Sequence, residues 1–439
     1  MTDTAPSAFS DPDRTPPLAQ AVPLGLQHVL AMFASNVTPS IIVAGAAGLA
    51  FGGAEQVYLI QMAMLFAGIA TLFQTIGVGP VGARLPIMQG TSFAFVGVLA
   101  GVAATQGLGV ALTACLIGGT LHFCLGAFIS KIRWLFPPLV TGLVILAIGL
   151  YLIPVAIKYA AGGAATFQME AESFGSLMHW TVALSVVIVA LALKFFTRGT
   201  LSNAAILVGL IVGYVLAFLF GMVSFDPVAN AAWITGITPM PYGFEFSLGA
   251  VIAVTLVSVV SAIETVGDTS ATTKAGAGRE ATDREISGAT YADGLGTAVA
   301  AVFGGLPNTS FSQNVGIVGM TGIMSRHVVT IGALVLILCG LLPKVGAVIA
   351  SMPLPVLGGG VIVMFGMVAA AGMNVLSEVK MNRRNMVIIA VSLAAGLGLN
   401  LVPTAVQYLP GVVQTLATSA VAPTALVAIG LNLLLPDEV

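Results

Sequence analysis

Apolar residues in this chain occur in long continuous runs, separated by short polar stretches, rather than in the alternating pattern of barrel strands. A helical run of about 20 apolar residues matches the hydrocarbon thickness of a bilayer. The pattern therefore predicts an all-α polytopic membrane protein with fourteen transmembrane segments. They lie near residues 24–44, 57–76, 83–104, 108–130, 137–157, 178–196, 201–221, 247–266, 286–304, 308–323, 327–350, 354–376, 385–403 and 409–435.

The third and tenth segments are interrupted by polar residues and helix breakers. Leu306–Gly322 carries Pro307, Gln313 and Asn314 between almost purely apolar neighbours, and Met88–Phe93 is a similar break in the third segment. In a bilayer such a break is tolerated only where it is buried in protein or lines a polar cavity. We interpret the two breaks as the halves of one substrate site.

The two halves of the chain repeat a pattern of prolines and glycines. A constant offset of 217 relates Pro138, Gly142, Val144, Ile145 and Gly149 to Pro355, Gly359, Val361, Ile362 and Gly366. Seven segments is an odd number, so the second copy must be inverted in the membrane. We expect repeats at 21–221 and 247–435 with a linker at 222–246, an arrangement typical of secondary transporters.

Charge adds an orientation. With a cytoplasmic N-terminus, all but Lys158 and Lys344 of the 15 basic residues fall on the inward side, as the positive-inside rule requires. Residues 1–20 lack the basic and apolar regions of a signal peptide and predict a disordered cytoplasmic tail. We expect a multi-pass protein of the inner membrane with both termini cytoplasmic.

Composition excludes other classes of protein. Charged residues are 7% of the chain, against about 25% in soluble domains, and the net charge of −2 without a basic cluster argues against a nucleic-acid partner. Cys115, Cys124 and Cys339 lie in apolar segments without metal-ligand or disulfide spacing. We interpret them as packing residues, and we expect no metal and no cofactor.

Three acidic residues lie inside or at the end of apolar segments. Glu264 and Asp268 are four residues apart, on one helical face, and Asp293 lies in the ninth segment. A charge at the bilayer centre costs about 2.5–3.5 kcal/mol on insertion scales, so these carboxyls are candidates for substrate binding or proton coupling. Headgroup positions for the first two, and a backbone-bonding role for Asp293, remain open alternatives.

Several polar and aromatic residues near the breaks are candidates for ligand contact. Gln313 and Asn314 offer amide donors and acceptors, and Phe93 could stack on a planar ligand beside Ser92. His28 is the histidine that lies well inside an early segment. Interhelical hydrogen bonding for the amides, packing for Phe93, helix capping for Ser92 and a satisfied core position for His28 are the alternatives.

These residues resemble the nucleobase–ascorbate transporter family. The segment SQNVGIVGMTG is similar to its signature, which falls on Gln313, Asn314, Gly316, Thr321 and Gly322. The contexts of His28, Glu264, Asp268, Asp293 and Met352–Gly360 are similar as well, and the resemblance covers nearly the whole chain after about residue 20.

The resemblance implies a seven-plus-seven inverted repeat divided into core and gate domains, with a short strand and a half-helix in each broken segment. It implies that Glu264 and Gln313 bond a nucleobase, that Phe93 lies beside it, and that Asp293 and His28 support the site. It further implies proton symport and a homodimer. Gln313 and the absence of histidines after Glu264 resemble the purine branch, with xanthine or uric acid expected rather than uracil.

Two rival functions fit the sequence less well. An anion transporter of the same architecture usually carries a soluble domain after the last span, whereas here only Pro436–Val439 follow, and carboxylates in the site disfavour an anion. An intramembrane aspartyl protease needs a Gly-x-Gly-Asp signature, which Thr265-Val266-Gly267-Asp268 does not supply. We therefore expect a transporter and not an enzyme.

Overall fold

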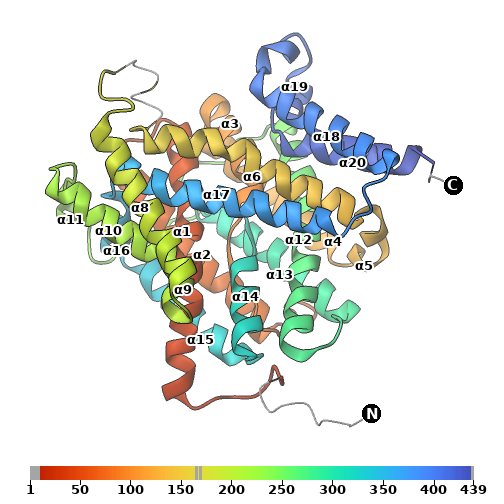
Figure 1. The fold of residues 1–439 in the computed structure, drawn as a ribbon, viewed down its shortest axis with the longest axis horizontal. Coiled ribbons are helices and arrows are strands. Elements are labelled where there is room, and N and C mark those ends of the chain that lie inside the picture. The colour runs from red at the N-terminus through yellow and green to blue at the C-terminus, as the bar shows by residue number, and fades with distance from the viewer. Residues whose placement is uncertain (1–9, 164–166, 168–170, 437–439) are drawn as a thin grey trace.

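The computed structural model describes residues 10–163, 167 and 171–436, which are mostly helical and contain one two-stranded sheet (Figure 1). A helix satisfies its own backbone hydrogen bonds, as a bilayer requires. The helices that contact the sheet or one another around it form a central group. They are α1 (Leu18–Ala46), α2 (Ala54–Ile76), η1 (Phe93–Phe95), α3 (Val96–Gln106), α4 (Leu108–Leu125), α12 (Leu248–Ala277), α13 (Asp283–Val302), α14 (Ser312–Thr321), α15 (Arg326–Leu341) and α16 (Pro343–Ala350).

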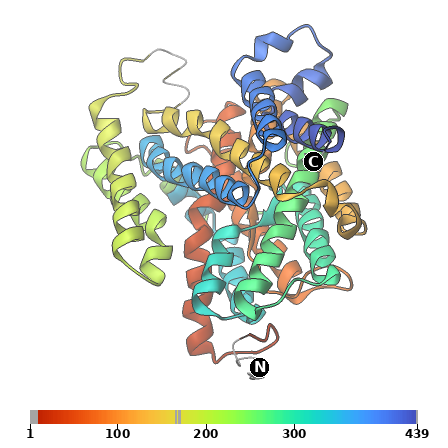
Figure 2. The same cartoon turned by 45° about the vertical axis from the view of Figure 1, so that its right-hand side comes forward.

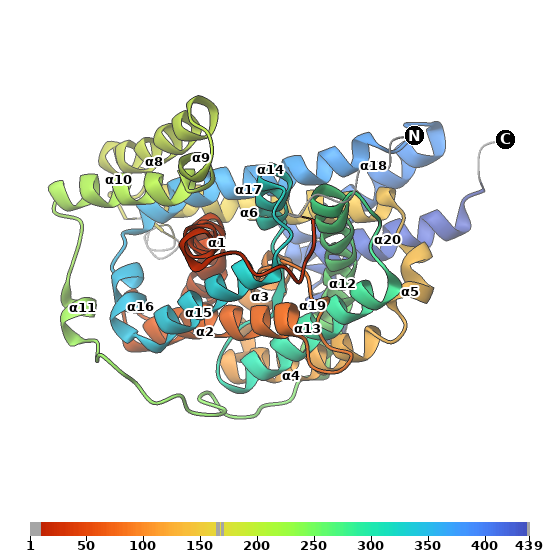
Figure 3. The same ribbon diagram turned by 90° about the horizontal axis from the view of Figure 1, so that it is seen from below.

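A second set of helices packs along one side of the central group and is called the flanking group here. Figure 3 shows α8, α17 and α18 in a row beside the central helices, and Figure 2 shows α8–α10 (yellow to green) at one edge of the molecule. Its members are α6 (Pro138–Ala160), α8 (Leu177–Phe196), α9 (Thr200–Asn203), α10 (Ala205–Leu219), α17 (Leu354–Ser377), α18 (Arg383–Leu401) and α20 (Val421–Leu434). Three short elements connect the two groups: α5 (Ile129–Ile132), η2 (Arg133–Leu135) and α11 (Asp226–Asn230). Two others, η3 (Pro403–Val406) and α19 (Gly411–Ala417), lie between α18 and α20.

The number of long apolar helices is smaller than the number of apolar runs in the sequence. Among the residues described, eight helices are long and apolar enough to cross a membrane, or up to 10 if two bent pairs each count as one span. The run at 327–350 bends by 81° between α15 and α16, because Pro343 lacks an N–H and favours extended backbone at Leu342. The run at 409–435 bends by 84° between α19 and α20, where Ala420 has a φ of 59°.

The helices α6 and α17 cross in close contact, and glycines make the contact possible. A Cβ on Gly149 would lie 2.3 Å from the backbone nitrogen of Ala369, and one on Gly372 would lie 2.4 Å from that of Leu146. Gly142 meets Leu376 one turn further along. Small residues thus allow the two backbones to approach, as is common between membrane helices.

The broken third and tenth segments meet in the middle of the molecule as an antiparallel pair of strands. Strand β1 (Gln89–Thr91) pairs with β2 (Asn308–Ser310), with Gly90 opposite Thr309. Each strand is followed by a helix, η1 and α3 after β1 and α14 after β2. The interruptions predicted from the sequence are therefore present, and both half-helices begin at the sheet.

The end of the expected N-terminal tail contacts the central group. Residues 1–9 lie outside the described residues, and α1 begins at Leu18. Between them, Asp13 accepts a hydrogen bond of 2.7 Å from Arg326, and the backbone oxygen of Arg14 accepts one of 2.6 Å from Ser325. This part of the chain is therefore held against the start of α15.

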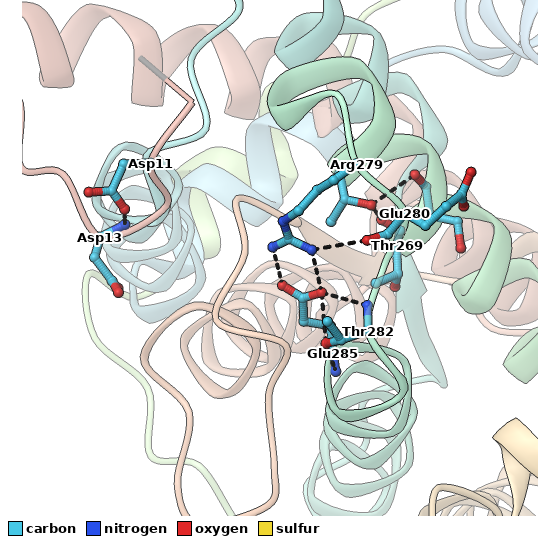
Figure 4. Close-up of polar contacts among 9 residues, drawn as sticks. Asp11, Asp13, Thr269, Arg279, Glu280, Thr282 and Glu285 are labelled. Atoms are coloured by element: carbon cyan, nitrogen blue, oxygen red, sulfur yellow. Dashed lines mark hydrogen bonds and ion pairs between the residues drawn. The ribbon is translucent and has the colours of Figure 1, made fainter. Parts of the chain in front are cut away.

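The turn between α12 and α13 is fixed by one carboxylate (Figure 4). Glu285 accepts hydrogen bonds of 2.8 and 2.5 Å from the two terminal nitrogens of Arg279. It also accepts 2.8 Å from the backbone N–H of Thr282, whose hydroxyl accepts from the Glu285 N–H in return, which makes a capping box at the start of α13.

We expect this turn to make the folded state sensitive to acid. Partial burial raises the pKa of Glu285, but hydrogen bonds from Arg279 and Thr282 outweigh it and hold the pKa below its ordinary value of 4.5. A lowered pKa contributes stability that is present above 4.5 and is lost as pH falls through the folded-state value. In detergent, the melting temperature of Glu285→Gln should therefore fall less between pH 7 and pH 4 than that of the wild type.

The control for that experiment is Glu280→Gln. Glu280 is an exposed residue whose carboxylate lies 3.9 Å from Lys274, a surface pair that contributes little. The Glu280→Gln variant should retain the acid sensitivity of the wild type. An equal fall in melting temperature in Glu285→Gln and in the wild type would contradict the prediction.

Candidate functional site

A cavity of about 250 Å³ opens beside the strand pair, between the central and flanking groups. This volume is just below the usual range of ligand pockets, about 300–1,000 Å³, which suits a small ligand. The central group contributes both strand ends, the first residues of both half-helices and Glu264 of α12, and the flanking group contributes apolar side chains of α6 and α17. The lining residues are Thr91, Ser92, Phe93, Ala94, Ile145, Ile148, Glu264, Thr309, Ser310, Phe311, Ser312, Gln313, Met367, Val368 and Ala371.

The strands that form the cavity wall are held by side chains of the central helices. Asn36 of α1 accepts a 2.8 Å hydrogen bond from the backbone N–H of Thr91, and Thr297 of α13 accepts one of 3.0 Å from that of Asn308. Thr71 of α2 accepts 2.9 Å from the N–H of Gln89. These buried bonds satisfy backbone groups that water cannot reach, so the strands form a fixed wall.

Glu264 is half-buried and lines the cavity. Its carboxylate makes no hydrogen bond to any residue that the structure describes, so both oxygens can accept hydrogen bonds from a ligand. Gln313 is half-buried on the first turn of α14 and lines the same cavity. The sequence predicted both residues as ligand contacts, and the structure brings them to one pocket from two helices.

Asp268 lies one helical turn from Glu264 and fixes the start of the second half-helix. Its two carboxylate oxygens accept hydrogen bonds of 2.7 Å each from the hydroxyls of Ser310 and Ser312. Ser310 and Ser312 also line the cavity, although neither was predicted from the sequence as a site residue. Asp268 therefore joins α12 to the turn between β2 and α14 rather than facing the cavity itself.

Asp293 is completely buried behind the strands. It accepts a 2.6 Å hydrogen bond from the side-chain nitrogen of Gln89 on β1 and a second one from the hydroxyl of Thr265 on α12. Neither Gln89 nor Thr265 was predicted as a site residue, although Gln89 lies within the interrupted segment. A buried carboxylate with two donors can hold a strand in place, and it is also a place where a proton can reside.

Asn314 and His28 contact each other away from the cavity. The Asn314 amide nitrogen donates a 2.9 Å hydrogen bond to the backbone oxygen of His28 and lies 3.0 Å from the His28 Nδ1 atom. Both side chains are buried and neither lines the cavity in the described structure. The pair ties α14 to α1, as interhelical polar contacts in membranes often do.

Phe93 and Ser92 lie at the start of the first half-helix. Phe93 lines the cavity and packs edge-on against Phe365 of α17, with ring centroids 5.3 Å apart. Ser92 lines the cavity too, while its hydroxyl accepts a 3.3 Å hydrogen bond from the backbone N–H of Ala94. Ser92 therefore caps η1 and remains beside the ligand space.

The remaining signature residues end the second half-helix. The hydroxyl of Thr321 donates 2.8 Å to the backbone oxygen of Ile317, and Gly322 has a φ of 66°, a left-handed conformation that favours glycine at a helix end. Gly316 lies on an exposed face of α14.

The cavity is suited to an uncharged, flat, polar ligand. Its lining within the described chain contains no Lys, Arg or His, and Glu264 is its acidic residue. Hydroxyls, an amide and the free N–H groups at the starts of two helices supply directed hydrogen bonds. Phe93, Ile145 and Met367 supply apolar surface for the faces of a ring.

Known proteins resemble this chain over nearly its full length. Residues 19–405 match the model of the Permease family. The chain is 35% identical over 443 residues to the xanthine permease XanP of Escherichia coli (strain K12), covering 96% of this chain and 93% of that protein. It is 36% identical over 417 residues to the uric acid permease PucK of Bacillus subtilis (strain 168), covering 94% and 95%.

A solved structure shares the fold at low sequence identity. The transmembrane domain of a cyanobacterium bicarbonate transporter, BicA, superposes with a TM-score of 0.62 at 16% identity, covering 94% of this chain and 97% of that one. This likeness shows a shared fold alone, because a sequence identity of 16% does not indicate a shared substrate.

Proposed function

This chain belongs to the Permease family, whose members are transporters and not enzymes, and from this premise we propose that it carries a purine nucleobase into the cell. Xanthine or uric acid is the proposed substrate, and a broader nucleobase specificity or uracil is the alternative. The observation that carries the proposal is the cavity at the strand pair, whose lining includes Glu264, Gln313 and Phe93.

The proposed binding mode uses the chemistry of the cavity wall. A purine edge that alternates donors and acceptors would bond the Glu264 carboxylate and the Gln313 amide, with Phe93 against one ring face. Ser310, Ser312 and the half-helix N–H groups lie within the same cavity wall and would complete the polar contacts. The acidic residue and the lack of a basic residue in the described lining disfavour an anion as the cargo, despite the shared fold with a bicarbonate transporter.

We propose proton symport as the energy source. Transport is coupled to a proton only if the substrate affinity differs between two protonation states of the site. Glu264 in the cavity, with Asp268 and Asp293 behind it, provides carboxyls close enough to the ligand space for such a difference.

We also propose that the architecture is a fourteen-span, seven-plus-seven inverted repeat in the inner membrane, with cytoplasmic termini and a homodimer as the assembly. The central and flanking groups would be its core and gate domains. The order of elements supports this, since each half contains one strand with a half-helix and one of the two crossing helices, α6 and α17.

An uptake experiment tests the substrate and the coupling together. Cells that express the chain should accumulate radiolabelled xanthine, and excess unlabelled uric acid, hypoxanthine or guanine should compete more strongly than uracil. A proton uncoupler should abolish accumulation, while removal of sodium should not. Absence of uptake above cells with an empty vector would overturn the proposal, and dominant competition by uracil would select the alternative.

A further inference from the structure

We infer that Gly97 of α3 and Gly316 of α14 are two equivalent seats on which the flanking helices close in turn, one on each side of the ligand cavity. The inference rests on the proposed transport function and names the contacts that open and close the path.

The strand pair relates the two glycines. Gly90 lies opposite Thr309 in the antiparallel register, so the half-helices that follow are related by an approximate two-fold axis through that pair. Gly97 lies seven residues after Gly90, and Gly316 lies seven residues after Thr309. The two glycines therefore occupy the same position on their half-helices.

Gly97 is in tight contact with the flanking group. A Cβ at this position would lie 2.7 Å from the hydroxyl oxygen of Tyr151 on α6 and 2.8 Å from two of its ring carbons. Tyr151 is buried, and its hydroxyl lies against α3 without good hydrogen-bond geometry to any residue described. One turn earlier, Phe93 packs against Phe365 of α17. On the α3 side, the path is therefore shut.

Gly316 faces open space. A Cβ there would meet nothing within 4 Å among the residues that the structure describes, and its neighbours Ser312 and Met320 are exposed. Gly267 on α12 and Gly366 on α17 are similarly exposed and free of close contacts with the described chain. On the α14 side, the path is therefore open.

The two flanking helices α6 and α17 differ in the side chain at the position that corresponds to Tyr151. At the repeat offset of 217, Tyr151 of α6 corresponds to Val368 of α17, which lines the ligand cavity. Closure on the other side would therefore bring Gly316 against the surface around Val368. A second cavity of about 1000 Å³ starts at Gly97 and continues along α3, lined by neutral polar side chains such as Gln106, Thr404 and Gln407. The Gly97–Tyr151 contact separates this outer space from the ligand cavity.

Cysteine accessibility measures the two states directly. In a background with Cys115, Cys124 and Cys339 replaced by serine, Ala371→Cys reports the open α14 side, since Ala371 is exposed beside the cavity. Val102→Cys reports the α3 side, since Val102 is 1% exposed and borders the second cavity. Maleimide labelling in detergent, without substrate, makes the result independent of orientation in the membrane.

We expect Gly97→Ala to disfavour the state seen here. It should lower the labelling rate of the Ala371 reporter about tenfold and raise that of the Val102 reporter, because overpacking at a buried contact costs enough to shift a two-state equilibrium by that factor. Combining it with Tyr151→Leu removes the ring atoms in the way and should restore both rates. Gly101→Ala, on the same helix with nothing described within 4 Å, is the matched control and should change neither rate.

Gly316→Ala provides a second test, in which the added methyl group clashes with no described residue of this structure. It fits this structure without contact, so the protein should fold, but it would obstruct the opposite closure and slow labelling of the Val102 reporter. Unchanged labelling in both glycine variants, with monodisperse protein, would overturn the inference. A chain that labelled as expected but took up no purine would support the two seats and overturn the proposed function alone.

Discussion

Replacing Glu264 by glutamine is expected to reduce purine uptake by at least about a hundredfold while the protein remains folded. The Glu264 carboxylate lines the cavity and makes no hydrogen bond within the described chain, so its loss removes a ligand contact and leaves packing intact. Loss of a hydrogen bond to a charged group costs about 1.5–3 kcal/mol, and loss of proton coupling adds to it. The measurements are xanthine uptake and the melting temperature in detergent.

The matched control for that experiment is Glu280→Gln, which makes the same chemical change at an exposed surface carboxylate. Both variants should melt close to the wild type, and only the Glu264 variant should lose uptake. Undiminished accumulation of purine by Glu264→Gln under a proton gradient would defeat the proposed mechanism.

Replacing Asp293 by asparagine is expected to abolish uptake as well, but together with a loss of stability. The buried carboxylate accepts hydrogen bonds from Gln89 and from Thr265. An asparagine here has one oxygen and one N–H₂ group, so it places a donor opposite one of these two donors. A buried polar group left without a partner costs about 1–3 kcal/mol, so the melting temperature should fall. The strand β1 carries Gln89, and the cavity wall should loosen with it.

The double variant Gln89→Glu with Asp293→Asn separates a structural role of Asp293 from a proton role. In the double variant the amide at position 293 donates to the carboxylate at position 89. The hydrogen bond between the two side chains is restored in the opposite direction, and the charge lies on β1. A purely structural role predicts recovery of both the melting temperature and uptake. Recovery of stability without uptake would indicate that the carboxyl must be at position 293.

The sequence indicated the site through residues that conflict with their surroundings. Polar residues and a proline in an apolar run predicted the interruptions, and a carboxyl in an apolar run predicted Glu264, because the cost of such residues in a bilayer demands a compensating use. Asn314 and His28 carry the same signal, yet the structure pairs them with each other. A polar residue in a membrane helix reveals that it has a partner, and the sequence does not say whether the partner is a ligand or another helix.

Ser310, Ser312 and Thr265 were beyond the reach of the sequence pattern, and Gln89 was marked only by its place in the interrupted segment. Serine and threonine are common in membrane helices, where they can bond to their own backbone, so their presence gives no signal. Their importance comes from tertiary contacts, because Ser310 and Ser312 donate to Asp268 of α12, and Gln89 and Thr265 donate to Asp293 of α13. The bends at Leu342 and near Ala420 were missed because hydropathy measures polarity and not direction.

By itself the sequence determined the class of the protein, the two broken segments and the acidic residue at the cavity, because each follows from the local cost of placing a residue type in lipid. It indicated the family through the resemblance of its signature residues. Only the tertiary structure decided which of the polar residues face the cavity and which hold helices together. It also decided which side of the cavity is closed, since the contact of Gly97 with Tyr151 and the open surroundings of Gly316 depend on how two groups of helices pack. Packing between segments far apart in the chain has no signature in the composition of either segment.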